Sequence, residues 1–232
     1  MTRLIFWEDA YKREFDARVI SSNGVEVVLD QTCFFASSGG QPSDTGTISD
    51  RPVVDVRTRE NEIVHVLERA HGFSAGDLVH GVIDWERRYR IMRLHSACHV
   101  MSGVLLKGFN IRRHTGIRIY EDRARMDFDM EKLDATILEA IEREANKIVE
   151  SHLEIVARIL SWEEVKRDPE LMTVSEERYE KFEAPRLLEI AGFDRQLDGG
   201  THVANTGEIG SIRIVARENK GKNNKRITLI VE

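Results

Sequence analysis

Three histidines and one aspartate are the residues whose types and spacing could form a metal site. His95 and His99 lie four positions apart in a segment with helical periodicity, so both imidazoles would face the same side of a helix, about 6 Å apart along its axis. Asp198 and His202 lie far downstream around a Gly-Gly turn, and they would have to reach that helix through a loop. Zinc accepts imidazole and carboxylate ligands, and closed sites usually have four of them. Together the two clusters predict one zinc ion per chain.

Each cluster alone has a plainer interpretation. Two histidines on one helix face are often ordinary helix residues, and an aspartate beside Gly-Gly often only caps a turn. If the clusters combine, the metal would act as a Lewis acid, with His95, His99 and His202 as the catalytic groups. Cys98 points about 100° away from His99 on the helix and is interpreted as a core residue. Cys33 stays open as a candidate nucleophile or ligand, and no general base is assigned.

The elements that must position these residues change type near residue 84. Residues 1–84 contain short segments of alternating or β-branched residues, separated by glycine-containing turns. The strands expected from them are 17–21, 25–29, 53–57, 63–67 and 78–83. Short strands at this spacing predict a small β-barrel. From Asp84, an N-cap type of residue, the spacing becomes helical, which predicts a first domain over 1–84 and a second over 85–232.

The second domain alternates between element types. We expect helices over 131–151, 162–168 and 175–179, in addition to the one that carries His95 and His99. The strands expected here are 117–128, 153–159, 186–190, 212–218 and 226–231. Helices segregated beside a mostly antiparallel sheet give a two-layer arrangement, so the predicted fold class is α+β.

The composition is that of a globular protein. The 232 residues include 34 Lys and Arg, 40 Asp and Glu and 41% hydrophobic positions, and the net charge is −6. No apolar run approaches the roughly 18 residues of a membrane span. Two cysteines and an N-terminus that soon turns acidic favour a cytoplasmic protein with no membrane partner. The net charge argues against wholesale nucleic-acid binding but says nothing about local basic patches.

Several motifs together resemble one known family. They are His95-Ser-Ala-Cys-His99, Asp198-Gly-Gly-Thr-His202 with Thr206-Gly-Glu-Ile-Gly210, the glycine-rich stretch 34–46, and segments 121–128 and 218–226. In this order they resemble the alanyl-tRNA editing proteins called AlaX, and the glycine-rich stretch resembles the medium-length form. The likeness spans nearly the whole chain. One departure is Asp198, which stands where the family usually has a cysteine ligand.

The resemblance implies a barrel-like first domain and an editing domain shared with alanyl- and threonyl-tRNA synthetases. The implied reaction is hydrolysis of serine, or of glycine, from wrongly charged alanine tRNA, with zinc and without a nucleotide cofactor. Thr115 aligns with the threonine through which the family reads the serine hydroxyl, although it could be a routine strand residue. Gly39, Gly40 and Gln41 would help to select the substrate, and a plain turn between strands is the alternative.

Bound RNA needs a positive surface, and two stretches of the chain could supply it. Lys and Arg contacts to phosphate release counterions, whereas the plainer interpretation of such charge runs is a solvated surface. The residues expected to contact tRNA are Arg87, Arg88, Lys220, Lys222, Lys225 and Arg226.

Two other functions remain open at this point. The chain could be a tRNA-binding module whose metal site is structural or lost, because Asp198 replaces the usual cysteine. It could also be a metal-dependent deacylase for another aminoacyl-tRNA or a small ester. In each case we expect a monomer or a weak homo-oligomer.

Overall fold

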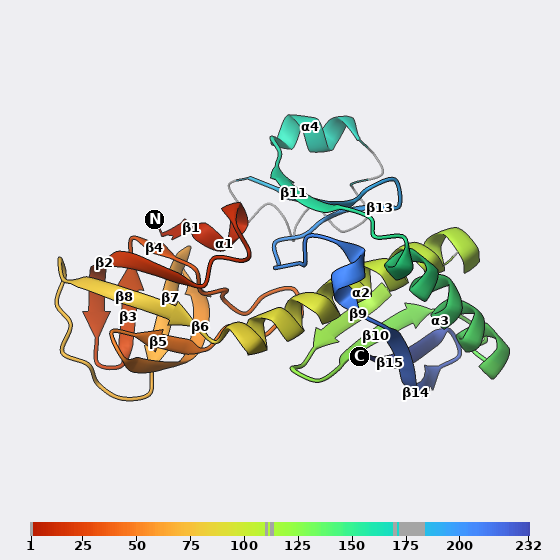
Figure 1. Ribbon diagram of the computed structural model, residues 1–232, viewed down its shortest axis with the longest axis horizontal. Helices are drawn as coiled ribbons and strands as arrows, with labels where there is room; N and C mark the ends of the chain where they lie inside the picture. Colours follow the sequence, from red (N-terminus) through yellow and green to blue (C-terminus); the bar gives the residue numbers. More distant parts are fainter. Residues whose placement is uncertain (1, 110, 112–113, 169–170, 172–183) are drawn as a thin grey trace. The chain divides into compact units, whose positions relative to one another are not determined.

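The computed structural model of the chain describes residues 2–109, 111, 114–168, 171 and 184–232. The fold is mixed α/β, and its strand pairs are antiparallel apart from β1 (Arg3–Leu4) with β4 (Gln31–Thr32), among the pairs formed by these residues (Figure 1). The chain forms two compact units, Met1–Ile91 and Met92–Glu232, and the division falls within the long helix α2 (Trp85–Phe109). The mixed, mostly antiparallel architecture expected from the sequence is therefore observed.

Six strands of the first unit pair in an order that closes on itself, β2-β3-β7-β6-β5-β8, with β8 paired again to β2. They are β2 (Glu14–Asn23), β3 (Glu26–Leu29), β5 (Gly46–Ile48), β6 (Arg51–Arg59), β7 (Glu62–Leu67) and β8 (Leu78–Ile83). All five strands expected here overlap with one of these, because alternate residues point inward and are apolar. The sequence did not predict β1, β4, β5 or the short helix α1 (Ile5–Glu8). The enclosed core includes Phe15, Val27, Leu29 and Phe34.

An ion pair is buried inside this unit. The guanidinium of Arg88, fully buried, binds both carboxylate oxygens of Asp44, which is 1% exposed. It also donates to the carbonyls of Cys33, at 2.7 Å, and Ala10, at 3.1 Å. Buried charges are tolerated when they are paired and fully hydrogen-bonded, so this arrangement joins the start of α2 to the loops around Cys33 and Asp44.

The second unit contains a four-stranded antiparallel sheet in the order β14-β15-β10-β9. Its strands are β9 (His114–Ile119), β10 (Ala124–Asp129), β14 (Ile212–Gly221) and β15 (Asn224–Val231). The single strand expected over 117–128 is wrong: the chain turns back at Tyr120, whose N–H bonds to the carbonyl of Arg123 at 2.8 Å, and a hairpin results. Polar residues at the turn separate two apolar alternations that had been interpreted as one.

Helix α3 (Ala135–Glu150) and a second sheet complete this unit. Asp134 caps α3 by accepting a hydrogen bond from the N–H of Ile137 at 3.0 Å. The second sheet has the order β11 (Ile155–Ile159), β12 (Arg186–Ile190), β13 (Asp194–Leu197). Helix α4 (Trp162–Arg167) begins with a capping box, and the 3-10 helix η1 (Thr206–Ile209) packs against α3. The helix expected over 175–179 lies outside the described residues.

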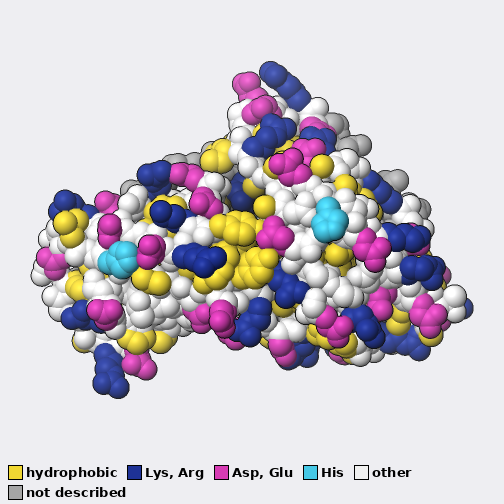
Figure 2. All heavy atoms as spheres, in the orientation of Figure 1, with side chains coloured by type: hydrophobic (Ala, Val, Ile, Leu, Met, Phe, Trp, Pro, Cys, Tyr) yellow, Lys and Arg dark blue, Asp and Glu magenta, His cyan; other side chains and the backbone are white. Residues whose placement is uncertain are grey.

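The surface carries charges of both signs. Figure 2 shows Lys and Arg side chains interspersed with Asp and Glu side chains over the face in view. Such mixing is typical of a surface without a single dominant field, so any basic site must be a local one. Among the described residues, none of the helices combines the length and the apolar character that crossing a bilayer requires.

Candidate metal centre

Helix α2 presents the first two candidate ligands. His95 and His99 are one helical turn apart, and they are buried, with 4% and 6% of their surface exposed. Their ring centroids are 5.4 Å apart. Two imidazoles held in the interior on one helix face need polar partners, because burying an unpaired polar group is costly.

The loop after strand β13 supplies the other two candidates. Asp198 follows the last residue of β13, and its N–H donates to the carbonyl of Arg186 at 2.9 Å. The Asp198 carboxylate accepts the N–H of Gly200 at 2.6 Å. The buried Arg186 guanidinium donates to the carbonyl of Gly200 at 2.8 Å. These bonds fix the loop so that His202, 5% exposed, reaches the same place as Asp198.

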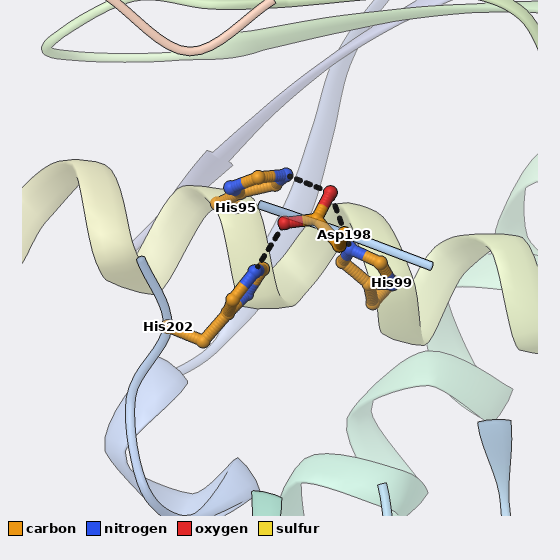
Figure 3. Close-up of side chains that lie close together, drawn as sticks. All are labelled: His95, His99, Asp198 and His202. Carbon is orange, nitrogen blue, oxygen red and sulfur yellow. Dashed lines mark hydrogen bonds and ion pairs between the residues drawn. The ribbon is translucent and has the colours of Figure 1, made fainter. Parts of the chain in front are cut away.

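The four side chains converge, as Figure 3 shows, with the histidines arranged around the carboxylate. The Nε2 atoms of His95 and His99 lie 3.5 and 3.7 Å from Asp198 Oδ2, and His202 Nε2 lies 2.9 Å from Asp198 Oδ1. All four candidate ligand atoms lie within 4.8 Å of one another. A tetrahedral zinc with bonds of about 2.0–2.1 Å holds its ligand atoms roughly 3.4 Å apart, so these side chains fit such an ion. The cluster could hold a metal ion.

Charges within the cluster are strongly coupled. Burial would raise the pKa of Asp198, but His95 and the hydrogen bonds from the three histidines hold it well below its usual range. Burial lowers the pKa of His202, and the neighbouring charge of His95 lowers it further. Burial also opposes charge on His99, yet its bonds to Asp194 and Asp198 raise its pKa to about 9. The cluster therefore combines an anionic carboxylate with one histidine that favours the charged form and one that favours the neutral form.

A second layer of polar residues holds the outer nitrogens of two histidines. Asp194, 8% exposed, places Oδ2 3.4 Å from His99 Nδ1, and its carboxylate also accepts from Gln196 Nε2. The Ser96 hydroxyl lies 3.4 Å from His202 Nδ1 and accepts the N–H of Val203 at 3.2 Å. Sequence reasoning missed these residues. The available signal was weak: Asp194 and Gln196 alternate on the strand that leads into Asp198, and Ser96 follows His95.

Both cysteines are buried and poorly suited to nucleophilic attack. Cys98 is fully buried, and burial raises the pKa of its thiol, in agreement with its interpretation as a core residue. Burial raises the pKa of the Cys33 thiol to about 12. A nucleophilic cysteine needs an accessible thiolate, so the open candidacy of Cys33 is not supported by its environment.

The expected substrate-binding residues lie outside the four-residue cluster. Thr115 is on β9, exposed, and its hydroxyl lies 3.5 Å from Asn224 Oδ1. Ser38 and Gln41 exchange two backbone hydrogen bonds around Gly39 and Gly40, whose φ angles are +58° and +92°. Positive φ at both central positions is the geometry of a tight hairpin turn, which explains both glycines structurally. Gln41 is 2% exposed.

Two of the expected tRNA contacts are wrong. Arg88 is fully buried and occupied by Asp44, so it cannot reach a phosphate. Lys225 is 7% exposed, and its ammonium donates to the carbonyls of Gly221 and Lys222 at 2.8 and 2.9 Å. A charge run in the sequence does not indicate which of its members the fold turns inward.

The other expected tRNA contacts are at the surface or partly exposed. Arg226 binds both carboxylate oxygens of Asp127 and keeps 24% of its side chain exposed. Arg87 donates to the carbonyl of Ser43 at 2.6 Å. Lys220 lies 3.6 Å from Glu218, and Lys222 is exposed.

Comparison with known proteins gives a consistent result. A family model described as "Threonyl and Alanyl tRNA synthetase second additional domain" matches residues 186–228, and one described as "tRNA synthetases class II (A)" matches residues 6–87. The chain is 37% identical to the "Alanyl-tRNA editing protein AlaX-M" of Saccharolobus solfataricus, with 100% of both chains covered. It is 39% identical to the protein of that name from Methanosarcina acetivorans, with 98% of each covered. It also matches 24% of the "Alanine--tRNA ligase" of Ignicoccus hospitalis, at 40% identity over 93% of this chain.

Proposed function

The chain belongs to the AlaX-M family of alanyl-tRNA editing proteins, and from this premise we propose that it hydrolyses serine from wrongly charged alanine tRNA in trans, with glycine as the second candidate cargo. It is an aminoacyl-tRNA deacylase, and so a hydrolase. The observation that supports a metal-dependent reaction is the convergence of three buried Nε2 atoms on Asp198.

We propose that His95, His99, His202 and Asp198 hold one zinc ion. Bound there, zinc would supply a Lewis acid that polarises the ester or a water. The residues themselves orient the site: Asp194 holds the Nδ1 side of His99, and the three Nε2 atoms face the Asp198 carboxylate. Asp198 is a harder ligand than cysteine and acts either as an oxygen ligand or as a hydrogen-bond acceptor.

The proposed cargo, serine, follows from the difficulty of distinguishing serine from alanine in an apolar pocket. Serine is alanine plus one hydroxyl, and an apolar pocket rejects such an analogue by only about a hundredfold. A site that bonds the hydroxyl can discriminate by about 10⁴ or more, so a second enzyme that binds serine corrects the error. We propose that Thr115 reads this hydroxyl, and that Gly39, Gly40 and Gln41 contribute to substrate selection.

The two domains would then have different roles. We assign the deacylase site to residues 85–232 and substrate selection by the glycine-rich motif to residues 1–84. For the tRNA partner we retain Arg87, Lys220, Lys222 and Arg226 as contacts, because each has exposed or partly exposed surface.

A binding module with a structural or lost metal site is the second candidate, and the substitution of aspartate at position 198 favours it. A metal-dependent deacylase for another cargo is the third. These alternatives differ in metal content, in turnover and in cargo, so one set of measurements separates them.

The decisive experiment measures release of the amino acid from tRNA loaded with serine, glycine or alanine, with and without a chelator. We expect fastest release of serine, loss of activity with chelator, and about one zinc per chain by elemental analysis. His202→Ala should abolish release, whereas the control His80→Ala, an exposed histidine of β8, should not. Full activity of His202→Ala would refute the metal-dependent reaction, and metal content without turnover would favour the binding module.

A further inference from the structure

Three arginines surround one tyrosine on the β9–β10 hairpin. The guanidinium carbons of Arg118, Arg123 and Arg125 lie 5.5, 4.7 and 5.4 Å from the centroid of the Tyr120 ring. We call these four residues the arginine cluster. Arginine is attracted to an aromatic face, but gathering three cations around one ring places like charges together.

The strand pairing sets two of these charges directly opposite each other. Arg118 of β9 is the register partner of Arg125 of β10, and both side chains leave the face of the sheet opposite the buried Ile119 and Met126. Like charges at directly opposite positions destabilise an antiparallel pair. An anion bound between them would relieve this repulsion.

The nearby carboxylates are already engaged by other cations. Asp122 pairs with Arg123 at 2.8 Å, and both oxygens of Asp127 bind Arg226, at 2.6 and 2.8 Å. Within the described parts of the chain, Arg118 and Arg125 form no ion pair with a carboxylate. The Nε atom of Arg125 is buried and lacks a hydrogen-bond partner among those residues. Arg118 is exposed and Arg125 is partly exposed, and neither is held by a carboxylate of the described residues, so their terminal N–H groups can donate to an external anion.

We propose that the arginine cluster is a phosphate-binding site, in which Arg118 and Arg125 bind the phosphodiester backbone of the RNA substrate. The guanidinium fork matches the geometry of phosphate oxygens, and it can bind them by two parallel hydrogen bonds. This inference rests on the proposed function, since it takes tRNA as the partner. It adds a contact site on β9 and β10 to the basic residues already proposed.

The test compares tRNA binding of the full chain and of Arg118→Gln/Arg125→Gln over a range of salt concentrations, with an unloaded alanine tRNA transcript as the probe. Each phosphate contact contributes roughly 0.7–0.9 to the slope of log affinity against log salt concentration. Between about 1 M and 0.1 M salt, one contact therefore raises the affinity roughly five- to eightfold. We expect the slope of the double variant to fall by about 1.5. The control is Arg143→Gln/Arg167→Gln, which removes the same charge from exposed side chains of α3 and α4.

A charge-preserving variant separates lost contacts from lost folding. Arg118→Lys/Arg125→Lys should keep the wild-type slope, because the number of charges is unchanged, while its affinity falls with the loss of the forked bonds. If the glutamine pair binds tRNA with the slope of the wild type and of the control pair, the inference is refuted. Deacylation by the wild-type chain distinguishes failure of this inference from failure of the proposed function. If the wild-type chain releases serine and the glutamine pair has an unaltered salt slope, only this inference is refuted. Absence of both tRNA binding and release refutes the proposed function as well.

Discussion

Substituting Asp194 by asparagine should weaken metal binding without disturbing the fold. Asp194 is not one of the four candidate ligands; it accepts a hydrogen bond from the Nδ1 side of His99 and so directs the Nε2 lone pair inward. Asparagine keeps the size of the side chain and removes its negative charge. Substitution of a residue that orients a metal-ligating histidine typically lowers the metal affinity by about 10- to 100-fold.

The structure places the expected loss near the lower end of that range. The distance of 3.4 Å between Asp194 Oδ2 and His99 Nδ1 is longer than an ordinary hydrogen bond, so the orienting interaction is a weak one. We therefore expect about a tenfold loss of zinc affinity in Asp194→Asn, which corresponds to about 1.4 kcal/mol. Asp194→Ala should lose more, because nothing then replaces the acceptor.

The assay is competition for zinc with a chelator of known affinity, supported by elemental analysis of the purified protein. Asp16→Asn is the matched control, since this carboxylate is 86% exposed on strand β2 and lies in the other unit. Far-ultraviolet circular dichroism checks that each variant is folded. If Asp194→Asn retains zinc as tightly as the wild type and Asp16→Asn, Asp194 does not position His99.

Three further predictions concern the first unit. Arg88→Met leaves the buried carboxylate of Asp44 without its cation and should lower the free energy of unfolding by about 3–5 kcal/mol, measured by urea denaturation; a loss under 1 kcal/mol would contradict the buried pair. His65 is fully buried and burial lowers its pKa to about 4, so the unfolded chain takes up its proton first as the pH falls below 6.5. Stability should therefore decrease between about pH 6.5 and pH 4, by up to about 3 kcal/mol, and His65→Gln should show a flatter pH dependence; parallel curves would refute this. Gly40→Ala forces a side chain onto a φ of +92° and should cost roughly 1–2 kcal/mol in thermal or urea unfolding, whereas an unchanged midpoint would show that the turn relaxes.

The sequence alone was informative where a pattern is local. Helical spacing placed His95 and His99 on one buried face of α2, and the alternation of apolar residues located the strands of the first unit. These features depend on periods of 3.6 and 2 residues, which can be counted along the chain. The motif around Asp198 and His202 was visible for a different reason: its residues are contiguous in the sequence.

Tertiary structure decided everything that depends on which side chains meet across the fold. It turned Arg88 and Lys225 inward, although their neighbours in the sequence are partly exposed, and it divided the expected strand over 117–128 into a hairpin. It also brought Asp194 to the outer nitrogen of His99, from which it is 95 residues away in the chain. Burial and pairing arise from contacts between distant segments, and a charged residue has the same appearance in the sequence whether it meets water, a carboxylate or an imidazole.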